Sequence, residues 1–142
     1  MRVIFTDIDG VLNPHWKSEW SKSSIAIYNT LCKEYDLKPV ISSTWRDNHT
    51  IQELRKIFTE QGIESEIYDY TPVISGADRG EEIKEWLKEN PVDDWVIIDD
   101  ITRNIEPHIG NVVKIRNLIG LTREEYLQIK KILDDENGNR RT

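Results

Sequence analysis

Two aspartates in the sequence VIFTDIDGVLN, residues 3–13, have the type and the spacing to carry out chemistry. Asp7 and Asp9 follow an apolar, strand-forming segment, and Gly10 then allows a sharp turn because it has no Cβ. One carboxylate can attack phosphorus and become an aspartyl phosphate. A second can give a proton to the leaving oxygen and take one from the attacking water. The pair therefore indicates either a phosphoryl-transfer site or only the solvated end of a strand.

Matching polar groups occur at three later places in the chain. They are the hydroxyls of Ser42, Ser43 and Thr44 in PVISSTWR, the guanidinium of Arg79 in DRG, and the carboxylates of Asp99 and Asp100 in VIIDD. Phosphoryl transfer to a carboxylate needs such groups, because hydroxyls and fixed cations hold the phosphoryl oxygens as charge moves. It also needs a divalent cation, since nucleophile and phosphate are both anionic, and Mg²⁺ prefers oxygen ligands.

The elements that would position these side chains alternate between short apolar strands and amphipathic helices. Strands are predicted at residues 2–6, 39–43, 64–68, 95–98 and 112–115, and helices at about 23–35 and after the start residues Thr50, Asp78 and Thr122. Each start residue is followed three positions later by a glutamate, which is the capping-box pattern. The alternation predicts a three-layer α/β/α sandwich around a central parallel sheet. Because ligands bind at the carboxyl ends of such strands, the candidate groups should meet at one edge.

Length and composition predict one soluble domain. The 142 residues suit a single domain at 1–135 with a frayed polar tail at 136–142. The net charge of −7 argues against broad, non-specific nucleic-acid binding, although it allows a narrow basic cleft. The single cysteine, Cys32, cannot form an internal disulfide, so a structural role and a cytoplasmic location are expected. No apolar run is long enough to span a bilayer, so no membrane partner is expected.

Taken together, the motifs DIDGVLN, SSTWR, DRGEEIKEWL, VIIDD and NLIGLT resemble those of the haloacid dehalogenase-like (HAD) phosphohydrolase superfamily. They are most similar to the compact phosphatase domains found alone or fused to nucleic-acid repair enzymes, over roughly residues 1–133. The resemblance implies a HAD-like Rossmannoid fold and a phosphatase in which Asp7 is the nucleophile and a metal ligand. Asp9 would be the general acid/base, with its backbone carbonyl also on the metal. Asp100 would bind Mg²⁺, with Asp99 bound directly or through water.

The resemblance also implies which side chains hold the phosphate. Ser43 would supply the phosphate-binding hydroxyl, with Ser42 and Thr44 as alternatives, because a one-residue register error turns a strand side chain over. The family's basic residue is usually lysine, and the matching position here is Arg79, which stays charged and can hold two phosphate oxygens. Lys84 is the second choice for this role. Contacts with the group that bears the phosphate are expected from Trp45 or Trp16, together with Arg46.

The length of the loops bears on the substrate. Only about ten residues, 13–22, separate the first motif from the next helix, so no sizeable cap domain can close over the site. An open site suits a phosphate on a large molecule, and a polynucleotide 3′-phosphate or a nucleotide is the favoured substrate. A small-metabolite phosphatase, a receiver-like phosphoacceptor and a non-catalytic binding module stay as alternatives. A receiver carries its phosphorylated aspartate at the end of a central strand, whereas strand 39–43, expected to be central, ends in serines.

Overall fold

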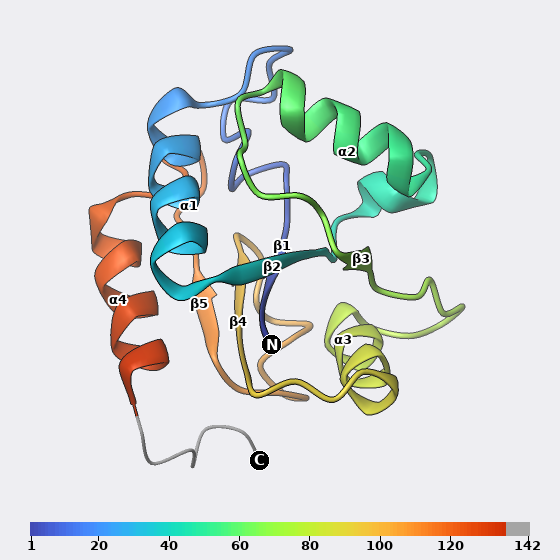
Figure 1. Ribbon diagram of the computed structural model, residues 1–142. Helices are drawn as coiled ribbons and strands as arrows, with labels where there is room; N and C mark the ends of the chain where they lie inside the picture. Colours follow the sequence, from blue (N-terminus) through green and yellow to red (C-terminus); the bar gives the residue numbers. More distant parts are fainter. Residues whose placement is uncertain (136–142) are drawn as a thin grey trace.

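The computed structural model describes residues 1–135, which form one five-stranded sheet with helices on both sides (Figure 1). The strands are β1 (Arg2–Thr6), β2 (Leu37–Ile41), β3 (Asp69–Tyr70), β4 (Asp94–Asp99) and β5 (Val112–Lys114). The helices are α1 (Lys22–Tyr35), α2 (Ile51–Glu60), α3 (Arg79–Glu89) and α4 (Arg123–Asp134), and a short 3₁₀ helix, η1, spans Thr44–Asp47. The tail expected at 136–142 lies outside the described residues.

The sheet is parallel throughout, with the strand order β3-β2-β1-β4-β5. Helices α1, α2 and α4 contribute to a core on one face that contains Tyr28 and Phe58, while α3 covers the other face with Ile83 and Trp86. This arrangement confirms the predicted three-layer α/β/α sandwich. The central strand is β1, so the expectation that strand 39–43 is central was wrong.

The strand order also separates this fold from the receiver-like alternative. Receiver domains have the flavodoxin-like order 2-1-3-4-5, in which the third strand of the chain is central. The order here is 3-2-1-4-5, with the first strand central. The sheet therefore does not have the receiver topology, and the acids at its edge must be interpreted on their own geometry.

The predicted helix starts are confirmed. In each case the backbone N–H of the start residue donates to the glutamate three positions on: Thr50 to Glu53 at 2.8 Å, Asp78 to Glu81 at 3.0 Å and Thr122 to Glu125 at 2.9 Å. These bonds satisfy backbone donors that have no partner within the helix. The start of α3 is thereby fixed, and the residue that follows Asp78 is Arg79.

Strand β2 begins and ends two residues earlier than predicted. Its buried side chains start at Leu37, and its pairing with β1 stops at Ile41. Ser43 then caps η1, because its hydroxyl accepts a hydrogen bond from the backbone N–H of Trp45 at 3.2 Å. Serine side chains compete for backbone groups in this way, so the segment VISS ends in a turn instead of continuing the strand.

The third strand was predicted at 64–68 but forms at Asp69–Tyr70, so this prediction was wrong in position. In the observed register, in which Val40 pairs with Asp69, residues 64 and 65 would lie beside Tyr35 and Asp36, before β2 begins. Pro39 then limits the pairing of the next residues. Its carbonyl accepts a hydrogen bond from the N–H of Tyr68 at 2.8 Å, so an N–H on Pro39 would also point toward this segment. Proline has no such donor, and the ladder therefore begins only beside the following residues of β2.

The loops at the carboxyl edge of the sheet are short. Segments 7–21 and 71–78, which lead from β1 to α1 and from β3 to α3, contain no helix and no named strand. Within residues 1–135 no cap domain is inserted at these places, as predicted. No helix in the same described range is both long and apolar enough to cross a membrane.

Cys32 lies in the core between α1 and the sheet. Burial raises the pKa of its thiol to about 12, so the thiol stays protonated at neutral pH. Because the thiolate is the reactive form of cysteine, this environment supports the predicted structural role.

Candidate active site

The alternation of side chains along the strands determines which polar groups meet. On β1, β2 and β4, the face toward α3 carries Phe5, Val40 and Ile97, and two positions later it carries Asp7, Ser42 and Asp99. The strand register continues to these residues, since the N–H of Asp7 donates to Ile98 and that of Ser42 to Thr6, both at 3.2 Å. Arg79 is the first residue of α3 and reaches the same edge.

Arg79 lies between two buried acids. Its Nη1 is 2.6 Å from Asp99 Oδ2 and 3.4 Å from Asp7 Oδ1. The exposed fraction is 6% for Asp7 and 0% for Asp99. The second oxygen of Asp99 accepts a hydrogen bond from the N–H of Ile101 at 3.0 Å. The sequence prediction that strand ends and the start of α3 bring acids and a guanidinium together is therefore realised in the geometry.

If Asp7 and Asp99 were both ionised, they would carry more negative charge than Arg79 neutralises. Burial raises the pKa of Asp7 to about 8, and the neighbouring Asp99 carboxylate acts in the same direction, while Arg79 opposes them. Burial likewise raises the pKa of Asp99, against the opposing effect of Arg79. Additional positive charge would favour the ionised form of both groups.

Asp100 joins the group from the loop after β4. Carboxylate oxygens of Asp7, Asp99 and Asp100 lie within 4.8 Å of one another. Gly10 makes this approach possible: a Cβ at that position would stand 2.2 Å from Asp100 Oδ2. Its φ of +85° also favours glycine, because other residues are strained there. The glycine of the DxDG sequence therefore keeps open the space that the Asp100 carboxylate fills.

This group of acids fits a divalent cation. Its donors are carboxylate oxygens, the hard ligands that Mg²⁺ prefers, and they lie close enough to share one ion. Burial and the neighbouring Asp99 raise the pKa of Asp7, and a bound cation would act in the opposite direction. The carboxylate of Asp9 is not part of the group. Asp9 would then contribute through its backbone carbonyl, which is the contact that the family resemblance implies.

The Asp9 carboxylate is held by Trp45. The indole Nε1 donates a hydrogen bond to Asp9 Oδ2 at 2.9 Å. Trp45 itself packs edge-on against Trp20, with ring centroids 5.5 Å apart, and stacks on His49 at 5.1 Å. The polar N–H of Trp45 therefore lies on the predicted general acid/base, and the expected contact of Trp45 with the substrate stays a prediction.

The three candidate hydroxyls lie at the same edge but in different environments. Ser42 Oγ is buried and, among the described residues, has no hydrogen-bond partner. Ser43 Oγ accepts the hydrogen bond that caps η1. Thr44 is exposed and lines a cavity beside Arg79. Ser42 is therefore the hydroxyl whose oxygen is buried on the Asp7 face without a partner.

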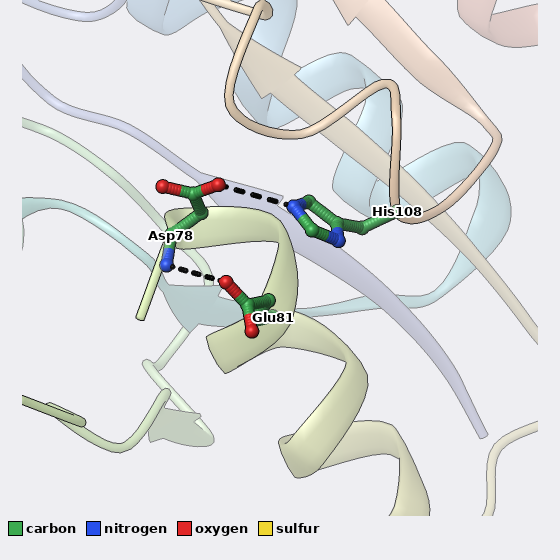
Figure 2. A group of neighbouring side chains, drawn as sticks. All are labelled: Asp78, Glu81 and His108. Carbon is green, nitrogen blue, oxygen red and sulfur yellow. Dashed lines mark hydrogen bonds and ion pairs between the residues drawn. The ribbon is translucent and has the colours of Figure 1, made fainter. Parts of the chain in front are cut away.

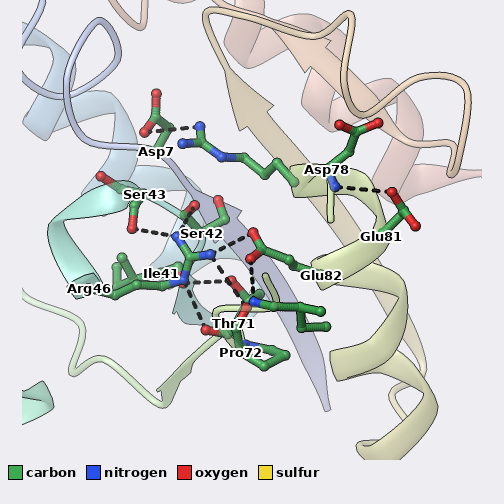
Figure 3. Close-up of polar contacts among 12 residues, drawn as sticks. Asp7, Ile41, Ser42, Ser43, Arg46, Thr71, Pro72, Asp78, Glu81 and Glu82 are labelled. Atoms are coloured by element: carbon green, nitrogen blue, oxygen red, sulfur yellow. Dashed lines mark hydrogen bonds and ion pairs between the residues drawn. The ribbon is translucent and has the colours of Figure 1, made fainter. Parts of the chain in front are cut away.

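Arg46 lies buried beneath the serine turn (Figure 3). Its side chain is 4% exposed and pairs with Glu82 of α3 at 2.6 Å. The same guanidinium donates to the backbone carbonyls of Ser42, Ser43, Thr71 and Pro72. This burial does not fit the expected substrate contact. Arg46 instead joins the end of β2, the loop after β3 and helix α3.

Two further candidates lie away from the acids. Lys84, the second choice for the basic role, is exposed on α3, and it is Arg79 that contacts the carboxylates. Trp16 lies on the loop between β1 and α1 and is 66% exposed. Its contact with the substrate stays a prediction.

A second group of ligand-type side chains, Asp78, Glu81 and His108, was not predicted (Figure 2). His108 Nε2 lies 3.2 Å from Asp78 Oδ2, and Glu81 accepts from the N–H of Asp78 at 3.0 Å. Both acids are exposed and already serve the start of α3. The sequence gives no signal for this group, because His108 comes from the loop after β4. Its contacts join the loop after β4 to the start of α3.

The comparisons with known proteins agree with this geometry. A family model described as "HAD domain in Swiss Army Knife RNA repair proteins" matches residues 3–126, which include every candidate from Asp7 to Asp100. Searches of curated proteins and of solved structures found no match. A HAD domain supports a phosphatase-type hydrolase, and HAD domains typically use a divalent metal. The chain belongs to the family of HAD domains that occur in Swiss Army Knife RNA repair proteins.

Proposed function

We propose that the chain is a Mg²⁺-dependent phosphomonoesterase that acts through an aspartyl phosphate on Asp7, with Asp9 as general acid/base. The favoured substrate is a polynucleotide 3′-phosphate or a nucleotide. The observation that carries the proposal is the group formed by Asp7, Asp99, Asp100 and Arg79 at the carboxyl edge of the sheet. Phosphoryl transfer to a carboxylate needs a nucleophile, a cation site and a fixed positive charge in one place.

In the first step, a carboxylate oxygen of Asp7 bonds to phosphorus. The bond between phosphorus and the substrate oxygen breaks, and its electron pair stays on that oxygen. The carboxylic acid of Asp9 gives this oxygen its proton, so the product leaves as an alcohol. Asp9 lies two residues after Asp7 at the same end of β1, immediately before the turn at Gly10.

In the second step, the Asp9 carboxylate takes a proton from water, and the water oxygen attacks phosphorus. The bond to Asp7 breaks, and its electron pair returns to the carboxylate as inorganic phosphate is released. Asp9 ends this step protonated, as it was at the start of the first. One residue thus serves as acid and then as base.

The phosphoryl oxygens need partners while their charge redistributes. Arg79 supplies a fixed cation, and Ser42 or Ser43 supplies a hydroxyl. We place Ser42 first, because its buried oxygen has no partner among the described residues, while Ser43 caps η1. Mg²⁺ bound by Asp7, Asp99 and Asp100 would supply positive charge against the anionic nucleophile and phosphate. Between turnovers, Arg79 limits the repulsion between Asp7 and Asp99.

The surroundings of the site support a large substrate. A cavity of about 320 Å³ adjoins Arg79, and its lining includes Thr44, Val73, Ile101, Arg103 and Asn104. The lining is mixed in charge, because Arg46, Arg79 and Arg103 are accompanied by Asp47, Asp78 and Glu82. The support for a nucleoside is therefore the volume of the cavity beside Arg79. The family's occurrence in RNA repair proteins supports a nucleic-acid end. A larger cavity of about 690 Å³ lies beside Leu37, at the amino end of β2, and so away from the acids.

The proposal is tested by phosphate release from p-nitrophenyl phosphate, nucleotides, and oligonucleotides with a 3′- or a 5′-phosphate. Each substrate is measured with Mg²⁺ and with EDTA, using the wild type and Asp7→Asn. We expect release that requires Mg²⁺, is lost in Asp7→Asn, and has its highest kcat/KM for the 3′-phosphorylated oligonucleotide. Release that persists in Asp7→Asn contradicts the mechanism. A preference for small esters contradicts the substrate class alone.

A further inference from the structure

Trp45 and Asp9 form a contact that the proposed chemistry leaves unexplained. The indole Nε1 of Trp45 donates to Asp9 Oδ2 at 2.9 Å, across 36 positions of sequence. Both side chains are half-buried, so the hydrogen bond is partly shielded from water. The bond can form in both states that the proposed chemistry needs, because Oδ2 accepts as the carbonyl oxygen of the acid and as an oxygen of the carboxylate, where the bond is charge-assisted.

The direction of the indole N–H is fixed by its packing. Trp45 meets Trp20 edge-on at 5.5 Å, and Trp20 meets Phe58 of α2 at 5.8 Å in the same geometry. On the other side, His49 stacks on the indole, and its Nδ1 lies 2.9 Å from the carbonyl of Trp45. A rigid aromatic side chain therefore presents one hydrogen-bond donor to one oxygen of Asp9.

We propose that Trp45 is a positioning residue for Asp9, an inference that rests on the proposed function. By holding Oδ2, the indole sets the rotation of the carboxyl group and leaves Oδ1 to exchange the proton. Asp9 Oδ1 then gives its proton to the leaving oxygen in the first step and takes one from water in the second. Without the indole, the carboxyl group rotates among several orientations, and only some of them reach the leaving oxygen.

The leaving group provides the test. Nitrophenolate departs without much help from an acid, whereas the alkoxide of a nucleoside phosphate needs a proton. In Trp45→Phe, which keeps an aromatic ring in the cluster, kcat/KM for a nucleoside phosphate should fall by about tenfold or more. For p-nitrophenyl phosphate it should fall by less than about threefold. kcat/KM reports the steps up to departure of the leaving group. Comparing the loss of kcat/KM for the two substrates therefore isolates the acid role of Asp9.

Trp86→Phe is the matched control, because it also removes an indole N–H that donates to an aspartate, Asp69 at 2.7 Å, and Trp86 does not belong to the cluster that holds Asp9. It should change kcat/KM for both substrates by the same factor. Thermal unfolding of both variants measures any general loss of stability. Asp9→Asn should also lose more kcat/KM for the nucleoside phosphate than for p-nitrophenyl phosphate, and the difference should be larger than in Trp45→Phe.

An equal loss for both substrates in Trp45→Phe, or no loss for either, overturns the inference. This failure is distinct from failure of the proposed function. If Asp7→Asn is inactive and Asp9→Asn shows the leaving-group selectivity while Trp45→Phe does not, the phosphatase stands and only the role of Trp45 is wrong. If Asp7→Asn keeps its activity, the proposed function itself fails.

Discussion

Asp7 is buried among other acids, yet a nucleophile must be ionised to attack. Burial and the Asp99 carboxylate together raise the pKa of Asp7 to about 8 in the metal-free protein. Arg79 opposes this effect but is shared between the two acids. The protonation of Asp7 should therefore depend on the metal. Removal of the metal favours the protonated acid, and binding of the metal favours the carboxylate.

A prediction follows for Asp7→Asn in EDTA. The folded wild type keeps the Asp7 proton up to about pH 8, whereas the unfolded chain loses it near pH 4. The folded state binds more protons in this window, so wild-type stability falls as the pH rises, by at most about 1.4 kcal/mol per pH unit. Asn does not titrate. The melting temperature of Asp7→Asn should therefore exceed that of the wild type by more at pH 8 than at pH 5. If the difference between the two melting temperatures is the same at both pH values, the account is contradicted.

The two serines after β2 can be separated by substitution. In Ser42→Ala, the substrate loses the hydroxyl that is buried on the Asp7 face, and KM should rise by about tenfold with a smaller change in stability. In Ser43→Ala, η1 loses its cap, so stability should fall by about 1 kcal/mol. Steady-state kinetics and thermal unfolding of both variants check this. If Ser43→Ala raised KM and Ser42→Ala did not, the phosphate would be assigned to Ser43, as the family resemblance implies.

At the residue scale, the sequence could predict which acids meet but not what holds each of them. Asp7, Asp99 and Arg79 come together because strand ends and a helix start share one edge, and a topological rule captures this. The bond from Trp45 to Asp9 depends on η1 turning the chain back after β2. Short 3₁₀ segments have no periodic pattern, so this contact could not be predicted.

At the scale of elements, one buried ion pair holds the edge of the sheet together. Glu82 of α3 pairs with Arg46 of η1 at 2.6 Å, and its second oxygen accepts from the N–H of Ile74 at 2.9 Å. Through Arg46, the same network binds the carbonyls of Ser42 and Ser43. Helix α3, the serine turn and the loop after β3 therefore share one set of contacts.

Glu82→Gln should reveal the cost of breaking this pair. The substitution keeps the shape of the side chain but leaves the buried charge of Arg46 without its partner, which should lower the free energy of unfolding by about 3 kcal/mol. Glu81→Gln, one position away and exposed, is the matched control and should cost about 1 kcal/mol or less. Denaturant unfolding measures both. Equal losses would show that the Arg46 pair contributes little.

A helix or strand could be predicted where its position is determined by residues close together in the sequence. The starts of α2, α3 and α4 were found because each capping box lies within four consecutive residues. The position of β3 was missed because it depends on Pro39, a residue of the neighbouring strand that lacks the donor the ladder needs. Pairing between strands is set by the partner, and the sequence of one strand does not show it.

For the whole molecule, the fold places Asp7, Asp99, Asp100 and Arg79 together at one edge of a parallel sheet, and a cation should stabilise that arrangement. Saturation with Mg²⁺ at 100 times its Kd should raise the free energy of unfolding by about 2.7 kcal/mol, seen as a higher melting temperature. Asp100→Asn should reduce this shift. Glu81→Gln should leave it unchanged, because Glu81 belongs to the second acidic group. If Glu81→Gln reduced the shift and Asp100→Asn did not, the metal site would be assigned to Asp78, Glu81 and His108.

The central claim is that Asp7 accepts the phosphoryl group, and this can be measured directly. Asp9→Asn is mixed with p-nitrophenyl phosphate and Mg²⁺, quenched in acid, digested and analysed by mass spectrometry. This variant can still form the aspartyl phosphate, because nitrophenolate leaves with little help from an acid. It lacks the base that activates water, so the aspartyl phosphate should accumulate. We predict one phosphoryl group on Asp7, removed by hydroxylamine and absent when Asp7 is also changed to Asn. Phosphate release with no modified residue, or modification of another acid, would contradict the account.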